Sequence, residues 1–130
     1  MVNILIKTDS KFKVNRDRLK DTVEKFLNEK RVKGNIEISI SIVGDRMMRQ
    51  LNKKYRDVDN TTDVLSFPMS DDSISTPFID SPDNVLRLGD IIISFPQAVE
   101  EAGEENKLVY DKIDELLEHG LLHLMGIHHD

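Results

Sequence analysis

Histidine is the residue type of this chain best suited to chemistry, and all four histidines lie in the last twelve residues. His119 and His123 are four positions apart, so a helix places both imidazole rings on one face, one turn apart. Gly126 predicts the end of that helix, because glycine adopts the left-handed conformation without a Cβ penalty. A turn there can bring His129 back toward the first two rings. Three converging imidazoles are typical of an open, catalytic zinc site, so the sequence predicts a metal bound by His119, His123 and His129.

A structural role or a terminal tag fits these histidines less well than a metal site. A single buried histidine is usually a hydrogen-bonded core residue, but the spacing H-x3-H-x5-H with glycine at the bend is a more specific pattern. A terminal tag would not carry leucines at helical spacing between its histidines. The spacing equals that of the long zinc-protease signature. Gly120 stands where that signature has the glutamate that activates water, so a peptidase mechanism lacks its general base.

Length and composition predict one soluble domain spanning residues 1–130. The chain has 130 residues, of which 38% are apolar and 32% are charged, and it has no cysteine. No apolar run approaches the roughly 20 residues of a membrane span, and the first residues do not read as a signal peptide. Disulfides are excluded, so any metal site must use histidine or carboxylate ligands, and a cytoplasmic location is expected.

Charge is divided unevenly along the chain. Residues 1–60 hold 15 Lys/Arg and 9 Asp/Glu, a net charge of +6, whereas residues 61–130 hold 3 and 15, a net charge of −12. Such asymmetry can mark a nucleic-acid surface beside an acidic metal-binding half. Solvated helix faces produce the same pattern, and composition alone favours that simpler interpretation.

Hydrophobic periodicity predicts four strands and about four helices. The clearest strand is residues 36–42, where isoleucine alternates with polar residues. The other strands are predicted at residues 2–7, 63–67 and 88–93, with a long loop from Met69 to Arg87. Helices are predicted from the N-cap Asn15 to a stop at Gly34, at residues 46–55 after an N-cap at Asp45, from the Ser94 capping box to Gly103, and from about Lys107 onward. Strands and helices do not alternate strictly, so the expected fold class is α+β: a single domain with a mixed four-stranded sheet and a zincin-like metal site on the last helix.

Four blocks of sequence, in this order, resemble the YbeY family of bacterial metal-dependent endoribonucleases. They are Leu51–Arg56 (LNKKYR), Thr62–Pro68 (TDVLSFP), Leu88–Ile91 (LGDI) and the histidine stretch His119–His129. The resemblance covers roughly residues 36–130. It implies that His119, His123 and His129 are the metal ligands and that Arg56 is functionally important. One position departs from the family, since His128 stands where aspartate usually precedes the third histidine.

The resemblance also implies a function: a zinc-dependent, single-strand-specific endoribonuclease that acts on ribosomal RNA, with a ribosome-associated role in a bacterial cytoplasm. Other divalent transition metals are compatible with the same ligands. The expected partners are therefore RNA and the ribosome or its proteins, and not a membrane. Two further function classes stay open: a metal-dependent, peptidase-like hydrolase and a non-catalytic, metal-binding ribosome-assembly factor.

The chemistry of phosphodiester cleavage assigns roles to further residues. Arg56 offers a planar, always charged fork for bidentate contact with phosphate, although a surface or structural role is equally consistent with its position. Asp63 and Asp90 either orient a ligating imidazole or cap a turn. The sequence assigns no general base, and attack by the ribose 2′-hydroxyl is equally open.

Overall fold

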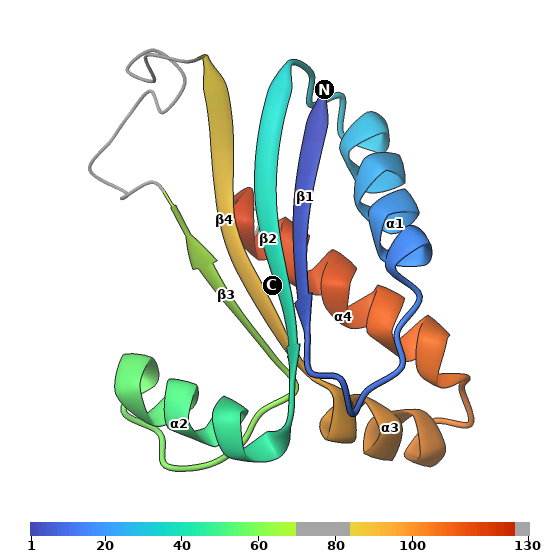
Figure 1. Cartoon of the computed structure of the whole chain (residues 1–130), viewed down its shortest axis with the longest axis vertical. Coiled ribbons are helices and arrows are strands. Elements are labelled where there is room, and N and C mark those ends of the chain that lie inside the picture. Colours follow the sequence, from blue (N-terminus) through green and yellow to red (C-terminus); the bar gives the residue numbers. More distant parts are fainter. Residues whose placement is uncertain (70–83, 127–130) are drawn as a thin grey trace.

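Four strands and four helices make up the part of the chain that the computed structural model describes, residues 1–69 and 84–126 (Figure 1). In chain order they are β1 (Val2–Thr8), α1 (Arg16–Glu29), β2 (Asn35–Val43), α2 (Asp45–Arg56), β3 (Val64–Pro68), β4 (Val85–Ser94), α3 (Phe95–Glu104) and α4 (Val109–Leu124). The predicted α+β fold is confirmed. No helix in the described ranges is long and apolar enough to cross a membrane.

The strands form one mixed sheet in the order β1-β2-β4-β3. β1, β2 and β4 are parallel, and β3 pairs antiparallel with β4, so β3 lies at one edge. The parallel pair β1–β2 requires a crossover, which α1 supplies. A β-bulge between Glu37 and Ile38 shifts the register of β2 against β4. Because α4 follows the whole sheet in the chain, it is free to pack across β3 and β4.

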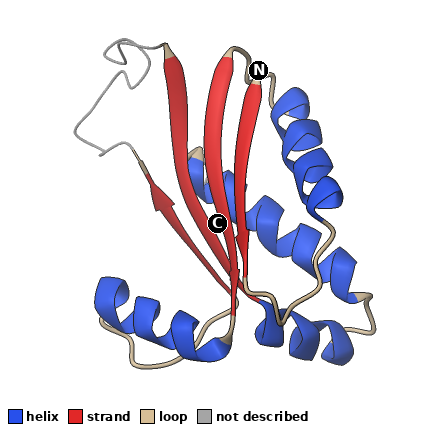
Figure 2. Ribbon diagram, in the orientation of Figure 1, coloured by secondary structure: helices blue, strands red, loops and turns tan. Residues whose placement is uncertain are grey.

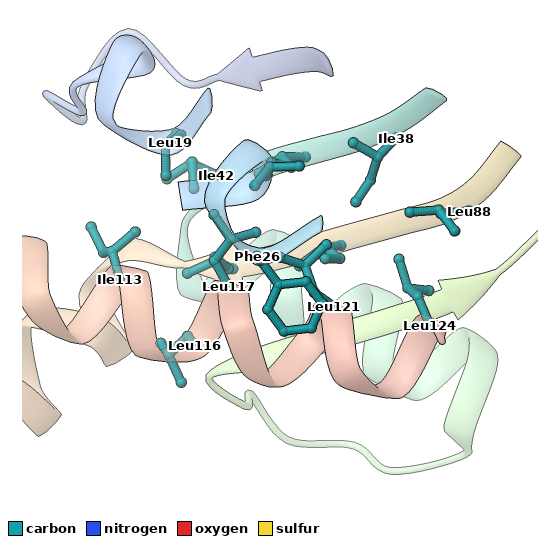
Figure 3. Packing of buried hydrophobic residues seen from close by; sticks show 14 of the residues in the cluster. Leu19, Phe26, Ile38, Ile42, Leu88, Ile113, Leu116, Leu117, Leu121 and Leu124 are labelled. Carbon is teal, nitrogen blue, oxygen red and sulfur yellow. The ribbon is translucent and has the colours of Figure 1, made fainter. Parts of the chain in front are cut away.

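One face of the sheet carries the hydrophobic core. The even-numbered isoleucines of β2 are 0–1% exposed, as the alternation of the sequence predicts, and they face α1 and α4. Figure 2 shows α4 passing behind the strands with α1 beside β1. In Figure 3 the ring of Phe26 from α1 lies beside Leu117 and Leu121 from α4. Burying each such side chain stabilises the fold by about 1.5–3 kcal/mol, so α4 is held firmly on the sheet.

Two predicted element boundaries are wrong, each for a local reason. α1 ends at Glu29 and not at Gly34, because Arg31 takes the left-handed conformation (φ 59°) and the amide of Val32 donates to the Leu27 carbonyl. β4 begins at Val85 within the predicted loop, because it pairs with β2 from Asn35 onward. The rest of that loop, residues 70–83, lies outside the described residues.

Asp45 is not the N-cap of α2, contrary to the prediction. Gly44 is the N-cap, and Asp45 is the first helical residue. The Asp45 carboxylate instead accepts hydrogen bonds from the hydroxyls of Thr61 and Ser94, each at 2.9 Å, and from the Gln97 amide at 3.2 Å. A partly buried carboxylate needs such donors, and here they come from two other segments. Asp45 therefore ties the start of α2 to the start of α3 and to the segment before β3.

Candidate functional site

α4 presents two of the four histidines on the side of its core stripe. Its apolar positions, among them Leu117, Leu121 and Leu124, are buried against the sheet, whereas the side chains of His119 and His123 are exposed. The helix ends at Leu124, and Gly126 has a left-handed φ of 73°, as the sequence predicts. His128 and His129 lie outside the described residues, so the predicted third ligand stays a prediction.

The two histidines open into a cavity of about 540 Å³ beside the edge strand β3. Its lining combines α4, β3 with the two residues before it, and the last residue of α2; the residues are Arg56, Thr62, Asp63, Val64, Leu65, Ser66, Phe67, His119, Gly120 and His123. The structure therefore brings Arg56 to the same cavity as His119 and His123, although 63 positions separate Arg56 from His119 in the sequence. Asp90, by contrast, is not among these lining residues.

Ser66 fixes the orientation of the His123 ring. Its hydroxyl is hydrogen-bonded to Nδ1 of His123, and both residues line the cavity. Ser66 comes from the centre of β3, where it pairs with Ile91 of β4, so the sheet fixes its position. With Nδ1 engaged, Nε2 is the nitrogen left for a ligand, which is how metal-binding histidines are usually held. The sequence did not single out Ser66 because the contact joins two segments far apart in the chain.

Gly120 brings α4 close to β4. A Cβ at this position would lie 2.9 Å from Cγ2 and 3.1 Å from Cδ1 of Ile91, closer than side chains normally approach. A glutamate here, as in the zinc-protease signature, would have to displace a fully buried core residue. The absence of that glutamate thus has a packing reason as well as a chemical consequence.

A carboxyl pair lies at the α3 side of the cavity. Asp63 lines the cavity, and its carboxylate accepts a hydrogen bond from the amide of Val64, the first residue of β3. It also interacts with Glu101 of α3. Burial, followed by the negative charge of Asp63, raises the pKa of Glu101. Two carboxyl groups this close repel each other when both are ionised, which a neighbouring cation can relieve.

Lys112 is that cation, and it is 5% exposed. Its Nζ lies 3.3 Å from Oε1 of Glu101, 2.9 Å from Oε2 of Glu105 and 3.5 Å from Oε1 of Glu115. The hydrogen bond to Glu105 is the main reason that the pKa of Lys112 is raised. Lys112 precedes His119 by two helical turns, so it lies on a similar side of α4. It anchors α3 to the helix that carries the histidines.

The segment after α2 places Arg56. Asp57 ends the helix in the left-handed conformation (φ 58°). The buried Asn52 side chain donates to the Asn60 carbonyl at 2.9 Å, and Arg49 pairs with Asp59 at 2.8 Å. These bonds fold the polar segment back along α2 and lead it into β3. Arg56, the last residue of α2, is left beside the cavity.

Within the described residues, no group of three His, Asp or Glu side chains lies close enough together to hold a metal ion. Two of the three predicted ligands, His119 and His123, share the cavity and lie at the predicted helical spacing. The donor set available to a metal in this part of the chain is thus two imidazoles, and His129 would have to complete it.

The described residues thus form an α+β domain in which a histidine-bearing helix is packed on the sheet, beside a cavity that an arginine also lines, an arrangement compatible with a small hydrolase. The chain belongs to the endoribonuclease YbeY family, whose model matches residues 4–130. The predicted family is therefore confirmed, and with it the prediction that the chain is an enzyme.

Individual relatives agree with this assignment. The endoribonuclease YbeY of Dehalococcoides mccartyi (strain CBDB1) is 37% identical over 133 residues, which cover 98% of this chain and 80% of that protein. The endoribonuclease YbeY of Moorella thermoacetica is 42% identical over 99 residues, and the match covers 76% of this chain but only 64% of that protein. The solution structure of a Thermotoga maritima protein is similar in fold, with a TM-score of 0.61 at 23% identity, covering 100% of this chain and 75% of that one.

Proposed function

We propose that this chain is a metal-dependent endoribonuclease that cleaves single-stranded RNA during ribosomal RNA maturation in the bacterial cytoplasm. The observation that carries the proposal is the common cavity of His119, His123 and Arg56. Two histidines, a residue type that suits a metal, and one arginine, a residue type that suits phosphate, line this one cavity. Membership of the endoribonuclease YbeY family supports RNA as the substrate.

The proposed metal is zinc, held by His119, His123 and His129, with other divalent transition metals as substitutes. The described part of the site fits such an ion: the histidines are one helical turn apart, and Ser66 holds Nδ1 of His123 so that Nε2 is left for the cavity. When bound, zinc would supply Lewis acidity toward a phosphate oxygen and would activate a water molecule near neutral pH.

Arg56 has the role of holding the scissile phosphate. A guanidinium donates two parallel hydrogen bonds to phosphate oxygens and keeps its charge at every physiological pH. Its position in the same cavity as the histidines of α4 lets it stabilise the negative charge that develops on the phosphate during cleavage. The ribosome and its proteins are the proposed partners, since they would present the RNA.

A peptidase activity is the main competing enzyme function, and the packing of α4 argues against it. The glutamate that activates water in zinc peptidases would occupy position 120, where even a Cβ meets Ile91 at 2.9 Å. A non-catalytic role in ribosome assembly is the other competing function. It would require the metal to be fully ligated by the protein and the cavity to have no catalytic use.

The proposal is tested with the zinc-loaded protein, offered in parallel a single-stranded RNA, the matching duplex and an unfolded protein. Cleavage of the single strand alone is expected, with loss of activity on chelation and in His119→Ala, while the metal content of His119→Ala falls. Cleavage of the unfolded protein would favour the peptidase. Tight metal binding without cleavage of any substrate would favour the assembly factor.

A further inference from the structure

Tyr55 has a different environment from the one its sequence position predicts. It follows Leu51 by four residues and so continues the apolar stripe of α2. In the structure, however, Tyr55 is 55% exposed, and the residue of this helix that is buried with Met48 is Asn52. Exposure alone is ordinary for a single surface tyrosine, but this ring lies next to the candidate active site, where an aromatic side chain can contact a ligand.

The exposed ring of Tyr55 is held in place by a second aromatic ring from the cavity. Its centroid lies 5.0 Å from that of Phe67, with the planes tilted by 56°, and Phe67 lines the cavity that contains the histidines. The Lys54 ammonium lies 5.1 Å from the Tyr55 centroid. We call Tyr55 and Phe67 the aromatic pair. It occupies the space between the last turn of α2 and the edge strand, next to Arg56.

The other tyrosine provides a comparison within the same protein. Tyr110 is 47% exposed, and the guanidinium over it belongs to Arg18, 5.7 Å from the ring centroid. That guanidinium is bound to Asp111 and Asp114 at 2.7 and 2.8 Å. The cation beside Tyr110 is thus neutralised within the fold. In the part of the chain that the structure describes, neither Lys54 nor Arg56 forms an ion pair.

We propose that the aromatic pair is a base-stacking subsite: an unpaired base of the RNA stacks on Tyr55, and the adjoining phosphate is held by Arg56. This rests on the proposed endoribonuclease function. Aromatic side chains flanked by cations are the usual way in which single-stranded nucleic acids are held without reading their sequence. A base within a duplex is already stacked on both faces, so the subsite selects unpaired RNA.

Phe67 gives the subsite its rigidity. It belongs to β3, where its backbone pairs with Asp90, and its contact limits the motion of the Tyr55 ring. A ring held before the RNA arrives loses little conformational entropy on binding. The alternative is that the aromatic pair only fastens α2 to the sheet. In that case an aliphatic side chain of similar size at position 55 would serve equally well.

Fluorescence can test the subsite directly, because the chain has two tyrosines and no tryptophan. The variant Tyr110→Phe leaves Tyr55 as the only tyrosine, so the tyrosine emission comes from this ring alone. This protein is titrated with a ten-nucleotide oligoadenosine, and in parallel with the same strand in a duplex, with chelator present to prevent cleavage. Quenching of Tyr55 by the single strand, and much weaker quenching by the duplex, is the expected result.

Affinity measurements separate stacking from packing. Tyr55→Leu should bind the oligoadenosine about fivefold to 150-fold more weakly, the loss expected for one base–aromatic stack, while Tyr55→Phe binds like the parent. Tyr110→Leu is the matched control and should leave affinity unchanged. Thermal unfolding of each variant shows whether α2 stays docked.

Each outcome is decisive. Parent-like affinity of a folded Tyr55→Leu, or RNA binding without a change in Tyr55 fluorescence, overturns the stacking subsite and leaves the proposed endoribonuclease intact. Failure of the parent protein to bind any RNA overturns both.

Discussion

The cations of this protein are used in two different ways in two regions, around α3 and α4 and along α2. Around α3 and α4 they are matched by carboxylates: Lys112 has three within 3.5 Å, and Lys107 and Arg18 have two each. Along α2, within the described residues, Arg49 alone is paired, with Asp59. Matched cations hold helices together. The unmatched ones on α2 are exposed, and Arg56 among them lines the cavity, so they can exchange counterions for phosphate.

The largest effect should come from removing the most deeply buried of the matched cations. Lys112→Met leaves Glu101, Glu105 and Glu115 without their shared partner in a partly buried location. The three carboxylates are 26–48% exposed, so water screens part of the loss. The free energy of unfolding in urea should therefore fall by up to about 3 kcal/mol, less than for a fully buried pair. Lys53→Ala on α2 is the matched control and should change it by less than about 0.5 kcal/mol.

The same cluster should make stability depend on pH. Lys112 and Lys107 hold the pKa of Glu105 below its usual value, so the stabilisation is present above the unfolded pKa and is lost as the pH falls through the folded one. The contribution of Glu101 to stability changes with pH in the opposite direction, because burial raises its pKa. The melting temperature should therefore drop on acidification below about pH 4.5, the ordinary range of a glutamate. This drop should be smaller in Lys112→Met, and an equal drop in both proteins would contradict the assignment.

Substitution of Arg56 should have the next largest effect, and this effect is on activity and not on stability. Arg56→Lys keeps the charge but loses the planar fork, so single-turnover cleavage should slow about tenfold to a hundredfold while RNA affinity changes little. Loss of one charge-assisted hydrogen bond costs about 1.5–3 kcal/mol, which corresponds to a decrease in rate of this size. Cleavage at the parental rate would show that Arg56 does not hold the scissile phosphate.

Ser66→Ala should weaken zinc binding about tenfold to a hundredfold, the usual effect of losing the hydrogen bond that orients a ligating histidine. Isothermal titration with zinc measures it, and Ser66→Thr should restore most of the affinity because it keeps the hydroxyl. Ser39→Ala is the control, since this serine of β2 alternates with the core isoleucines and so faces away from α4. Unchanged affinity in Ser66→Ala would mean that His123 is oriented by other groups.

The smallest effect belongs to the unmatched cations far from the catalytic atoms. Lys53→Ala should lower RNA affinity slightly and reduce the slope of log affinity against log salt by about 1, because one phosphate contact is lost. Binding measured at two salt concentrations is sufficient. Lys107→Ala, from the matched group, should leave the slope unchanged. A similar change in both variants would contradict the proposed difference between the matched and the unmatched cations.

Local patterns predicted much of this molecule. The alternation in residues 36–42 and the spacing of His119 and His123 each depend on the geometry of one element, and the structure reproduces both. Such local patterns do not predict contacts between segments that are distant in the sequence. Ser66 beside His123 and Lys112 among three glutamates arise only when β3, α3 and α4 have packed. His129 stays a prediction, as do zinc and the span of the domain over residues 1–130.

Tyr55 shows that a correct helical period of apolar residues does not by itself predict which of them are buried. The spacing of Met48, Leu51 and Tyr55 is typical of the helix over residues 46–55, and α2 is present, yet its last apolar position is exposed beside the cavity. Periodicity reports which residues share a face of a helix. It does not report whether the neighbouring sheet is wide enough to cover that whole face.

The close approach at Gly120 has an evolutionary consequence. Positions 91 and 120 occupy one shared volume, since a Cβ on residue 120 would fall within 3.2 Å of three side-chain carbons of Ile91. A lineage that gains alanine at 120 must therefore shrink residue 91, or else α4 moves away from β4 and carries His119 and His123 away from Ser66. These two positions should vary together among relatives, and their combined size should change far less than either residue alone.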